Sequence, residues 1–189
     1  MAPFALHLLR HGAPEGAGRL IGQTDALPTA EGIAACVAQA NGLGVEAVLS
    51  SDLARAARPA EAIAEPLGLS ATVDPRWREL DFGAWDGQAA DTIDTEALGR
   101  FWSDPDANPP PGGERWSALV ARVGLALVDL DPRPTLVVTH AGAMRAAFAS
   151  LCGFGQRELW AFDLPYAGLV SLRVWPGTPS CAQIVAMRP

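Results

Sequence analysis

Short apolar runs alternate with stretches of helical spacing along the first half of the chain. Residues 4–9 form an apolar run that predicts a buried strand, and apolar positions recur at helical spacing over 29–43. Residues 45–49 predict a second strand, and the next helical face covers 53–67. The Ser-Ser-Asp sequence at 50–52 is expected to cap this second helix. The predicted order is strand, helix, strand, helix.

The second half continues the alternation. The predicted elements are a strand over 71–74, a helix over 116–130, a strand over 135–139, a helix around 144–151, and strands over 169–175 and 182–187. The apolar residues of 77–87 follow neither helical nor strand spacing. Residues 103–113 are rich in proline and glycine and are predicted to form a loop. Alternating strands and helices predict a three-layer α/β/α sandwich with a mainly parallel central sheet. We expect residues 1–189 to form one domain.

Composition narrows the possible chemistry. All 14 cationic side chains are arginine, and no lysine occurs. Walker-type phosphate loops and Schiff-base enzymes both need a lysine, so these classes are excluded. The formal net charge of −7 argues against nucleic acid or an anionic membrane as partners, because both require a basic surface. An anionic small molecule must therefore be held by a local group of arginines.

The cysteine spacing and the first residues of the chain indicate the cellular compartment of the protein. Cys36, Cys152 and Cys181 are widely separated, which predicts neither a disulfide framework nor a zinc knuckle. The chain starts with MAPFALHLLRHG, which lacks a basic leader and a small-residue cleavage site. No uncharged apolar run reaches the length of a membrane span. We expect a cytoplasmic protein whose cysteines are small core residues.

Polar side chains follow three of the predicted strands at their carboxyl ends. The first strand leads into Arg10-His11-Gly12, the second leads to Arg55 in the next helix, and the strand over 135–139 leads into His140-Ala141-Gly142. Ligands of open α/β sheets bind outside the carboxyl ends of the strands. We therefore expect two histidines and two arginines at one edge of the sheet, with Glu79 from the irregular segment nearby.

Each residue type suits phosphoryl transfer. The guanidinium groups of Arg10 and Arg55 can each form bidentate hydrogen bonds with two phosphoryl oxygens, and they stay positively charged at any physiological pH. Cationic neighbours disfavour a protonated imidazole, so His11 is expected to stay neutral and to attack phosphorus, giving a phosphohistidine. Glu79 can supply the proton that a departing alkoxide needs. The glycines that follow the two histidines would let backbone N–H groups approach the anion.

Five motifs occur in a fixed order along the chain. They are LLRHG at 8–12, SSDLARA at 50–56, ELDFGAWDG at 79–87, PGGE at 111–114 and VVTHAG at 137–142. This set resembles the histidine phosphatase superfamily, whose founding members are phosphoglycerate mutases. The resemblance implies a phosphoglycerate mutase-like fold, with His11 as the phosphorylated nucleophile and Glu79 as the proton donor. It also implies that Arg10, Arg55 and His140 complete the phosphate pocket.

The chain departs from the family pattern at two positions. Ala17 stands where the family often has asparagine, so one phosphate contact is expected to come instead from Gln23 or Thr24. Pro59 stands where threonine is common, which alters a helix face rather than the chemistry.

A metal site is not expected. Four strand residues at ~3.3 Å each place His7 and His11 about 13 Å apart, too far to share one ion. We therefore predict no metal and no cofactor, and we interpret His7 as a structural residue.

Several other residues have structural interpretations. Asp81 and Asp86 are expected to stabilise their loop, with Asp81 as an alternative acid. Glu114 is expected to cap or begin the following helix, and Trp116 is expected in the core. Arg58 is interpreted as a solvated helix charge.

These inferences predict a phosphomonoesterase that acts on a small phosphorylated metabolite. Residues 79–87 and the aromatic segment 159–162 resemble α-ribazole phosphatases of cobalamin assembly, which makes α-ribazole 5′-phosphate the candidate substrate. Two alternatives stay open: a phosphoglycerate mutase-type phosphotransferase, and a protein phosphohistidine phosphatase or phosphopeptide-binding module. Mutases of the family are usually longer, so a chain of 189 residues favours hydrolysis. The oligomeric state is left open.

Overall fold

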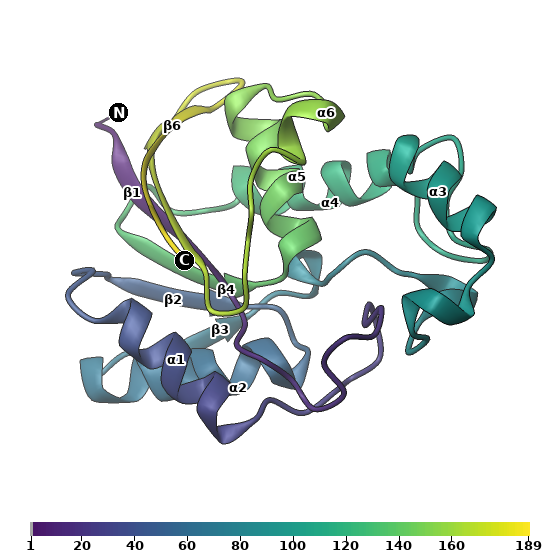
Figure 1. Ribbon diagram of the computed structural model, residues 1–189. Helices are drawn as coiled ribbons and strands as arrows, with labels where there is room; N and C mark the ends of the chain where they lie inside the picture. Colours follow the sequence, from purple (N-terminus) through teal and green to yellow (C-terminus); the bar gives the residue numbers. More distant parts are fainter. Residues whose placement is uncertain (1) are drawn as a thin grey trace.

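A six-stranded sheet forms the centre of the computed structural model, which describes residues 2–189 (Figure 1). The strands are β1 (Phe4–Arg10), β2 (Ala47–Ser50), β3 (Ala71–Val73), β4 (Thr135–Thr139), β5 (Leu169–Trp175) and β6 (Cys181–Arg188). Their order in the sheet is β3-β2-β4-β1-β5-β6. The first four strands are parallel, while β5 is antiparallel to both β1 and β6. The prediction of a mainly parallel sheet is confirmed.

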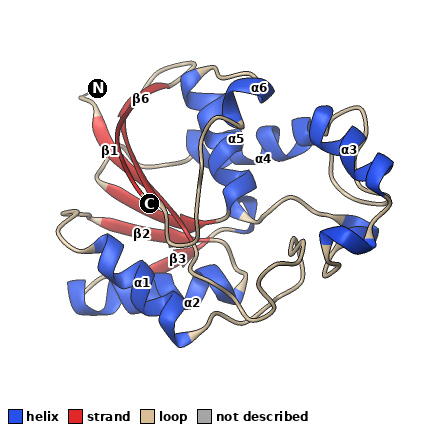
Figure 2. Cartoon of the chain, in the orientation of Figure 1, coloured by secondary structure: helices blue, strands red, loops and turns tan. Residues whose placement is uncertain are grey.

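Helices cover both faces of the sheet (Figure 2). They are α1 (Ala30–Ala40), α2 (Ala54–Ala64), α3 (Thr95–Ser103), α4 (Trp116–Val128), α5 (Ala141–Cys152) and α6 (Gln156–Leu159). Successive strand residues point to opposite faces. In β1, Leu8 packs into the core formed with α4 and α5, and Leu9 packs into the core formed with α1 and α2. The three-layer α/β/α sandwich is therefore confirmed.

The register of the central strands sets where the loops after them meet. All five residues of β4 are buried, as a continuous apolar or β-branched run requires when both faces are covered. β4 pairs with β1 so that Arg10 lies opposite Thr139, and with β2 so that Ser50 lies opposite Val138. The carboxyl ends of β1, β2 and β4 therefore coincide at one edge of the sheet.

Two helices are not predicted by the hydrophobic spacing, α3 and α6. The nine-residue α3 is capped by Asp94, whose carboxylate accepts the Ala97 N–H at 2.8 Å. It contains Gly99, which weakens the helical signal. Phe101 fixes the helix by packing against Phe82 and Trp85, with ring centroids 6.1 and 5.7 Å away. Tertiary packing, rather than local propensity, holds α3 in place.

The start of α2 differs from the prediction. Its N-cap residue is Leu53, which makes no side-chain cap. The Ala54 N–H instead donates to Asp25 Oδ1 at 2.6 Å, from a loop distant in sequence. Ser51 and Asp52 bind side chains of other segments, so the predicted cap at 50–52 is wrong.

The start of α4 also differs. Its N-cap residue is Arg115, and Glu114 forms an ion pair with Arg122 at 2.8 Å instead of capping the helix. Trp116 packs against the core but is only half-buried, because one of its faces borders a cavity.

The three cysteines are free and differ in burial. Cys36 is buried, Cys152 is half-buried, and Cys181 is exposed on the edge strand β6. The prediction that all three lie in the core is therefore wrong for Cys181. Among the helices formed by residues 2–189, none is both long enough and apolar enough to cross a bilayer.

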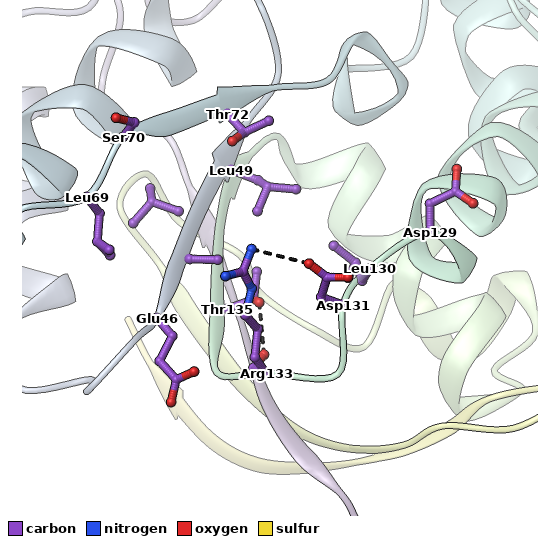
Figure 3. Close-up of a pocket in the computed structure, with 12 residues that line it drawn as sticks. Glu46, Leu49, Leu69, Ser70, Thr72, Asp129, Leu130, Asp131, Arg133 and Thr135 are labelled. Atoms are coloured by element: carbon purple, nitrogen blue, oxygen red, sulfur yellow. Dashed lines mark hydrogen bonds and ion pairs between the residues drawn. The ribbon is translucent and has the colours of Figure 1, made fainter. Parts of the chain in front are cut away.

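One cavity lies at the amino ends of the parallel strands (Figure 3). It has a volume of about 340 Å³, and its walls include Glu46 before β2, Ser70 before β3 and Arg133 before β4. Arg133 lies 3.3 Å from Asp131 in an exposed ion pair. The predicted site residues follow the carboxyl ends of the strands, so this cavity is at the opposite end of the sheet.

Candidate active site

The two histidines that follow β1 and β4 lie next to each other. The His11 N–H donates to the Thr139 carbonyl at 2.8 Å, which continues the pairing of the two strands. The ring centroids of His11 and His140 are 5.0 Å apart in an edge-to-face arrangement. His11 is 5% exposed, and His140 is fully buried. The structure thus brings the two imidazoles together at the carboxyl edge of the sheet.

A hydrogen bond fixes the tautomer of His11. Its Nδ1 lies 2.7 Å from the Gly12 carbonyl, and because a carbonyl oxygen only accepts, Nδ1 carries the proton. Burial, followed by Arg55 and Arg10, lowers the pKa of His11 to about 3, although the bond to Gly12 opposes this. The ring is therefore neutral at pH 7, with a lone pair on Nε2. The sequence interpretation names the arginines as the cause, but burial is the larger one.

His140 is also held as a neutral ring. Its Nε2 lies 2.7 Å from Ser51 Oγ. Burial, followed by Arg55 and His11, keeps the pKa of His140 well below its usual range. The role of Ser51 was not visible in the sequence, where a serine after a strand also fits a helix cap.

The two arginines are anchored by backbone carbonyls. Arg55 is fully buried. Its Nη atoms donate at 2.6 to 3.2 Å to the carbonyls of Ile21, Gly22 and Thr24. Arg10 donates to the Leu164 carbonyl at 2.6 Å, and its guanidinium carbon lies 4.1 Å from the centroid of the Tyr166 ring. Tyr166 also lies 5.6 Å from the His11 ring, between centroids, and no sequence pattern marks it.

We call Arg10, His11, Arg55 and His140 the histidine–arginine cluster. Six buried side-chain nitrogens or oxygens have no hydrogen-bond partner within residues 2–189, and three of them belong to this cluster. They are Nε of Arg10, Nε of Arg55 and Nδ1 of His140. A buried donor without an acceptor costs about 1–3 kcal/mol. An anion with several oxygens would satisfy such donors with charge-assisted bonds.

Glu79 is fixed beside the start of α5. The Leu80 N–H donates to its Oε1 at 2.8 Å, and the Gly142 N–H donates to its Oε2 at 3.1 Å. Each carboxyl oxygen thus accepts one backbone N–H. The Gly142 N–H is engaged by Glu79, which corrects the expectation that it is offered to the bound anion.

Close packing explains both glycines of the predicted phosphate pocket. A Cβ at Gly142 would overlap the Glu79 carboxyl group. A Cβ at Gly12 would overlap the backbone of Gly32, near the start of α1. Gly12 therefore allows the end of β1 to pack on α1, a reason different from the close approach of an anion that the sequence interpretation gives.

Arg122 holds the backbone that carries Glu79. It donates at 2.7 to 2.9 Å to the carbonyls of Arg76, Arg78 and Glu79. It also donates to both carboxyl oxygens of Glu114, at 2.8 and 2.9 Å. Sequence reasoning does not assign Arg122 a role, but there was a signal: it is the one charged residue in the sequence of α4.

Gln23 and Thr24 lie between the cluster and Glu79. The Gln23 side-chain amide donates to the Glu79 carbonyl at 2.8 Å and accepts from Arg78 at 3.0 Å. The Thr24 side chain is exposed, as is Ala17. The structure thus gives Gln23 a bond to the Glu79 backbone, and contact of Gln23 or Thr24 with phosphate stays a prediction.

The loop carboxylates and His7 have the expected structural contacts. Asp86 accepts the backbone N–H groups of three successive residues, Gly22, Gln23 and Thr24, at 2.8 to 3.0 Å. Asp81 accepts the Gly83 N–H at 2.8 Å. His7 Nδ1 lies 2.8 Å from Ser171 Oγ, within the sheet. In the part of the chain that the structure describes, no three His, Cys, Asp or Glu side chains are grouped as metal ligands would be.

Known families and proteins resemble the chain over most of its length. The family described as histidine phosphatase superfamily (branch 1) matches residues 6–186. The chain is 33% identical over 162 residues to the "Probable phosphoglycerate mutase GpmB" of Salmonella paratyphi B, across 78% of this chain and 74% of the relative.

Solved structures show the same likeness. A mycobacterial glucosyl-3-phosphoglycerate phosphatase in complex with VO3 superposes with a TM-score of 0.85 at 27% identity, over 97% of this chain and 98% of that one. A "putative alpha-ribazole-5'-P phosphatase" of Escherichia coli K-12 gives 0.82 at 23% identity, over 98% and 96%. At 23% identity the second likeness concerns the fold alone.

The low pKa of His11 predicts a loss of stability in acid. In the unfolded chain a histidine titrates near ~6.5, whereas His11 in the folded protein titrates at about 3. Between these values the unfolded state binds the extra proton, so the stabilisation is complete above about pH 6.5 and falls as the pH drops towards 3. His11→Gln removes this titration. Between about pH 5.5 and 4.5 the variant should lose about 1.3 kcal/mol less unfolding free energy than the parent protein.

Urea unfolding at each pH measures this difference. All other titrating groups are common to both proteins, so parallel pH profiles would contradict the prediction.

Proposed function

Because the chain belongs to the histidine phosphatase superfamily, we propose that it hydrolyses a small phosphomonoester through a phosphohistidine intermediate. The observation that carries this proposal is the histidine–arginine cluster. His11 presents an unprotonated Nε2, while buried nitrogens of Arg10, Arg55 and His140 have no partner within residues 2–189. A tetrahedral phosphate placed there would give those nitrogens acceptors and would put phosphorus beside the nucleophile.

In the first step, His11 Nε2 attacks phosphorus and forms an N–P bond while the P–O bond to the leaving group breaks. Arg10, Arg55 and His140 hold the phosphoryl oxygens and stabilise the charge that develops on them. Glu79 donates its proton to the leaving oxygen, so that a neutral alcohol departs.

In the second step, Glu79 acts as a carboxylate. It takes a proton from a water molecule while the oxygen of that water bonds to phosphorus. The N–P bond breaks and its electron pair returns to Nε2 of His11. Inorganic phosphate leaves, and Glu79 again holds the proton for the next cycle.

The substrate and the cellular setting are the finer parts of the proposal. The resemblance of residues 79–87 and 159–162 to α-ribazole phosphatases supports α-ribazole 5′-phosphate and a role in cobalamin assembly. The free cysteines support a cytoplasmic location. The identity of 33% to a "Probable phosphoglycerate mutase GpmB" favours phosphoryl transfer to a second alcohol as the alternative function.

His11→Ala should lower the turnover of p-nitrophenyl phosphate at least about 1,000-fold, since the variant has no nucleophile. With the parent protein and a labelled phosphomonoester, quenching in alkali should trap label on His11, and the label should end in inorganic phosphate. His7→Gln, which changes a buried histidine outside the cluster, is the control. Turnover that survives in His11→Ala would refute the covalent mechanism, and label that ends on an added alcohol would favour the mutase.

Glu79→Gln should slow alkyl phosphates about 100- to 10,000-fold, because their alkoxides need a proton to depart. p-Nitrophenyl phosphate should be affected much less, because nitrophenolate leaves as an anion. Asp81→Asn is the matched control, as Asp81 is the alternative acid. The measurement is the ratio of kcat/KM for an alkyl phosphate to kcat/KM for p-nitrophenyl phosphate. If this ratio fell in Asp81→Asn and not in Glu79→Gln, Asp81 would be the proton donor.

Arg122→Lys should act through Glu79. Lysine cannot bond three carbonyls and both oxygens of Glu114 at once, so the Glu79 backbone loses its support. We expect kcat on an alkyl phosphate to fall about 10-fold or more with little change in KM, and p-nitrophenyl phosphate to be affected less.

Arg133→Lys, in the exposed pair at the opposite end of the sheet, is the control. Equal losses on both substrates in Arg122→Lys would mean that Arg122 supports the fold and not the position of the acid.

A further inference from the structure

A cavity lined by aromatic side chains adjoins Glu79. We call it the tryptophan pocket; its walls include Trp102, Trp116, Trp160, Phe82 and Phe101. Residues from α3, the first turns of α4 and α5, and the end of α6 meet there. In Figure 1, α3 stands beyond the end of α4, at the side of the molecule away from α1 and α2.

The pocket borders Glu79, the proton donor of the proposed mechanism. Glu79 is part of its wall, as are Ala141 and Gly142, which directly follow His140. Under the proposed function, Glu79 protonates the oxygen of the leaving group. Whatever is bonded to that oxygen must therefore lie against the Glu79 side of the phosphate. The tryptophan pocket adjoins Glu79 and is therefore our candidate for that space.

The aromatic walls are arranged as ring-binding surfaces. Trp102 and Trp160 meet edge to face, with centroids 5.1 Å apart, and Phe101 lies 4.7 Å from Trp102. Trp102 and Trp160 are each 40% exposed, so these two indoles leave apolar surface uncovered beside the pocket. A flat ring would cover that surface and would also gain the geometric preference of aromatic pairs.

The size of the pocket limits its occupant. Its volume is about 110 Å³. An apolar cavity of about 150 Å³ holds one benzene ring. The pocket is smaller than this, so one ring is the largest group it can take, and part of that ring would lie outside it against the exposed surfaces of Trp102 and Trp160.

The charges around the pocket disfavour a small acidic leaving group. Arg145 is the one cationic residue of its wall. Its guanidinium group donates to the carbonyls of Leu159 and Phe162 at 3.3 and 3.1 Å and lies 4.6 Å from the Trp160 centroid. Arg145 thus braces the indole, while the Glu79 carboxyl group adjoins the same space. A carboxylated leaving group would compete with these carbonyls and with the Trp160 ring for Arg145, and it would leave both indoles uncovered.

We propose that the tryptophan pocket binds the leaving group and selects phosphomonoesters whose alcohol carries a flat aromatic ring. This inference rests on the proposed function, because Glu79 fixes which side of the phosphate the alcohol occupies.

Benzyl phosphate and ethyl phosphate test the selection, because both release a primary alkoxide and differ mainly in the ring. We expect kcat/KM to be at least about 10-fold higher for benzyl phosphate. In Trp102→Ala and Trp160→Ala this ratio should fall towards one, and in Trp102→Phe and Trp160→Phe it should be partly kept. Trp175→Ala, at the opposite end of the sheet, is the matched control and should keep the ratio of the parent protein.

Binding of phosphonates separates this inference from the proposed function. Calorimetry should give a lower Kd for 2-phenylethylphosphonate than for propylphosphonate, by the same factor of at least about 10, with no chemical step involved. Equal Kd values, or equal kcat/KM values for the two esters, would overturn the pocket and leave the phosphatase proposal intact. Failure of the parent protein to form a phosphohistidine with any ester would instead overturn the mechanism.

Discussion

The parallel pairing of β1 with β4 is the constraint on which the site depends. With Arg10 opposite Thr139, the next residue of each strand is a histidine, and the two rings meet 5.0 Å apart. A second proton is disfavoured on either ring, because burial and two nearby guanidinium groups lower the pKa of both histidines. One backbone register thus produces two neutral imidazoles and a strongly cationic pocket in the same place. A shift of one residue would move every β1 side chain to the opposite face and separate the rings.

Burying two arginines requires support from the backbone, and that support connects the site. The carbonyls of Ile21, Gly22 and Thr24 accept hydrogen bonds from Arg55, and N–H groups of the same loop donate to Asp86. Gln23 extends the loop to the Glu79 carbonyl, which Arg122 also holds. The part that binds an anion and the part that carries the carboxyl group are therefore joined by hydrogen bonds through one short segment. Displacing either part would strain the other, which fits a reaction whose acid and nucleophile must act on opposite sides of one phosphorus atom.

The sequence predicts the elements whose signals are local. Strands such as Thr135–Thr139 are continuous apolar or β-branched runs, and the rule for parallel sheets then brings the loops after them together. Contacts made between distant segments have no such signal. Ser51 and Asp52 have the composition of a helix cap, yet they bind other segments, and Asp25 caps α2 from a loop. The engagement of Gly142 by Glu79 is likewise a contact between distant segments that no spacing reveals.

The parts that escape prediction are those that shape the space beyond Glu79. α3 and α6 are short, and they are held by aromatic packing and by Arg145 rather than by the sheet. Such elements can change sequence without disturbing the strand register, whereas the histidine–arginine cluster cannot. The fold thus separates a charged half fixed by backbone pairing from an apolar half fixed by side-chain contacts. Glu79 and Gly142 line the apolar half and are bonded to each other, so a ring seated there would contact the side chain that we propose as the proton donor. In the proposed mechanism, selection of the alcohol and its protonation are therefore coupled at one carboxyl group.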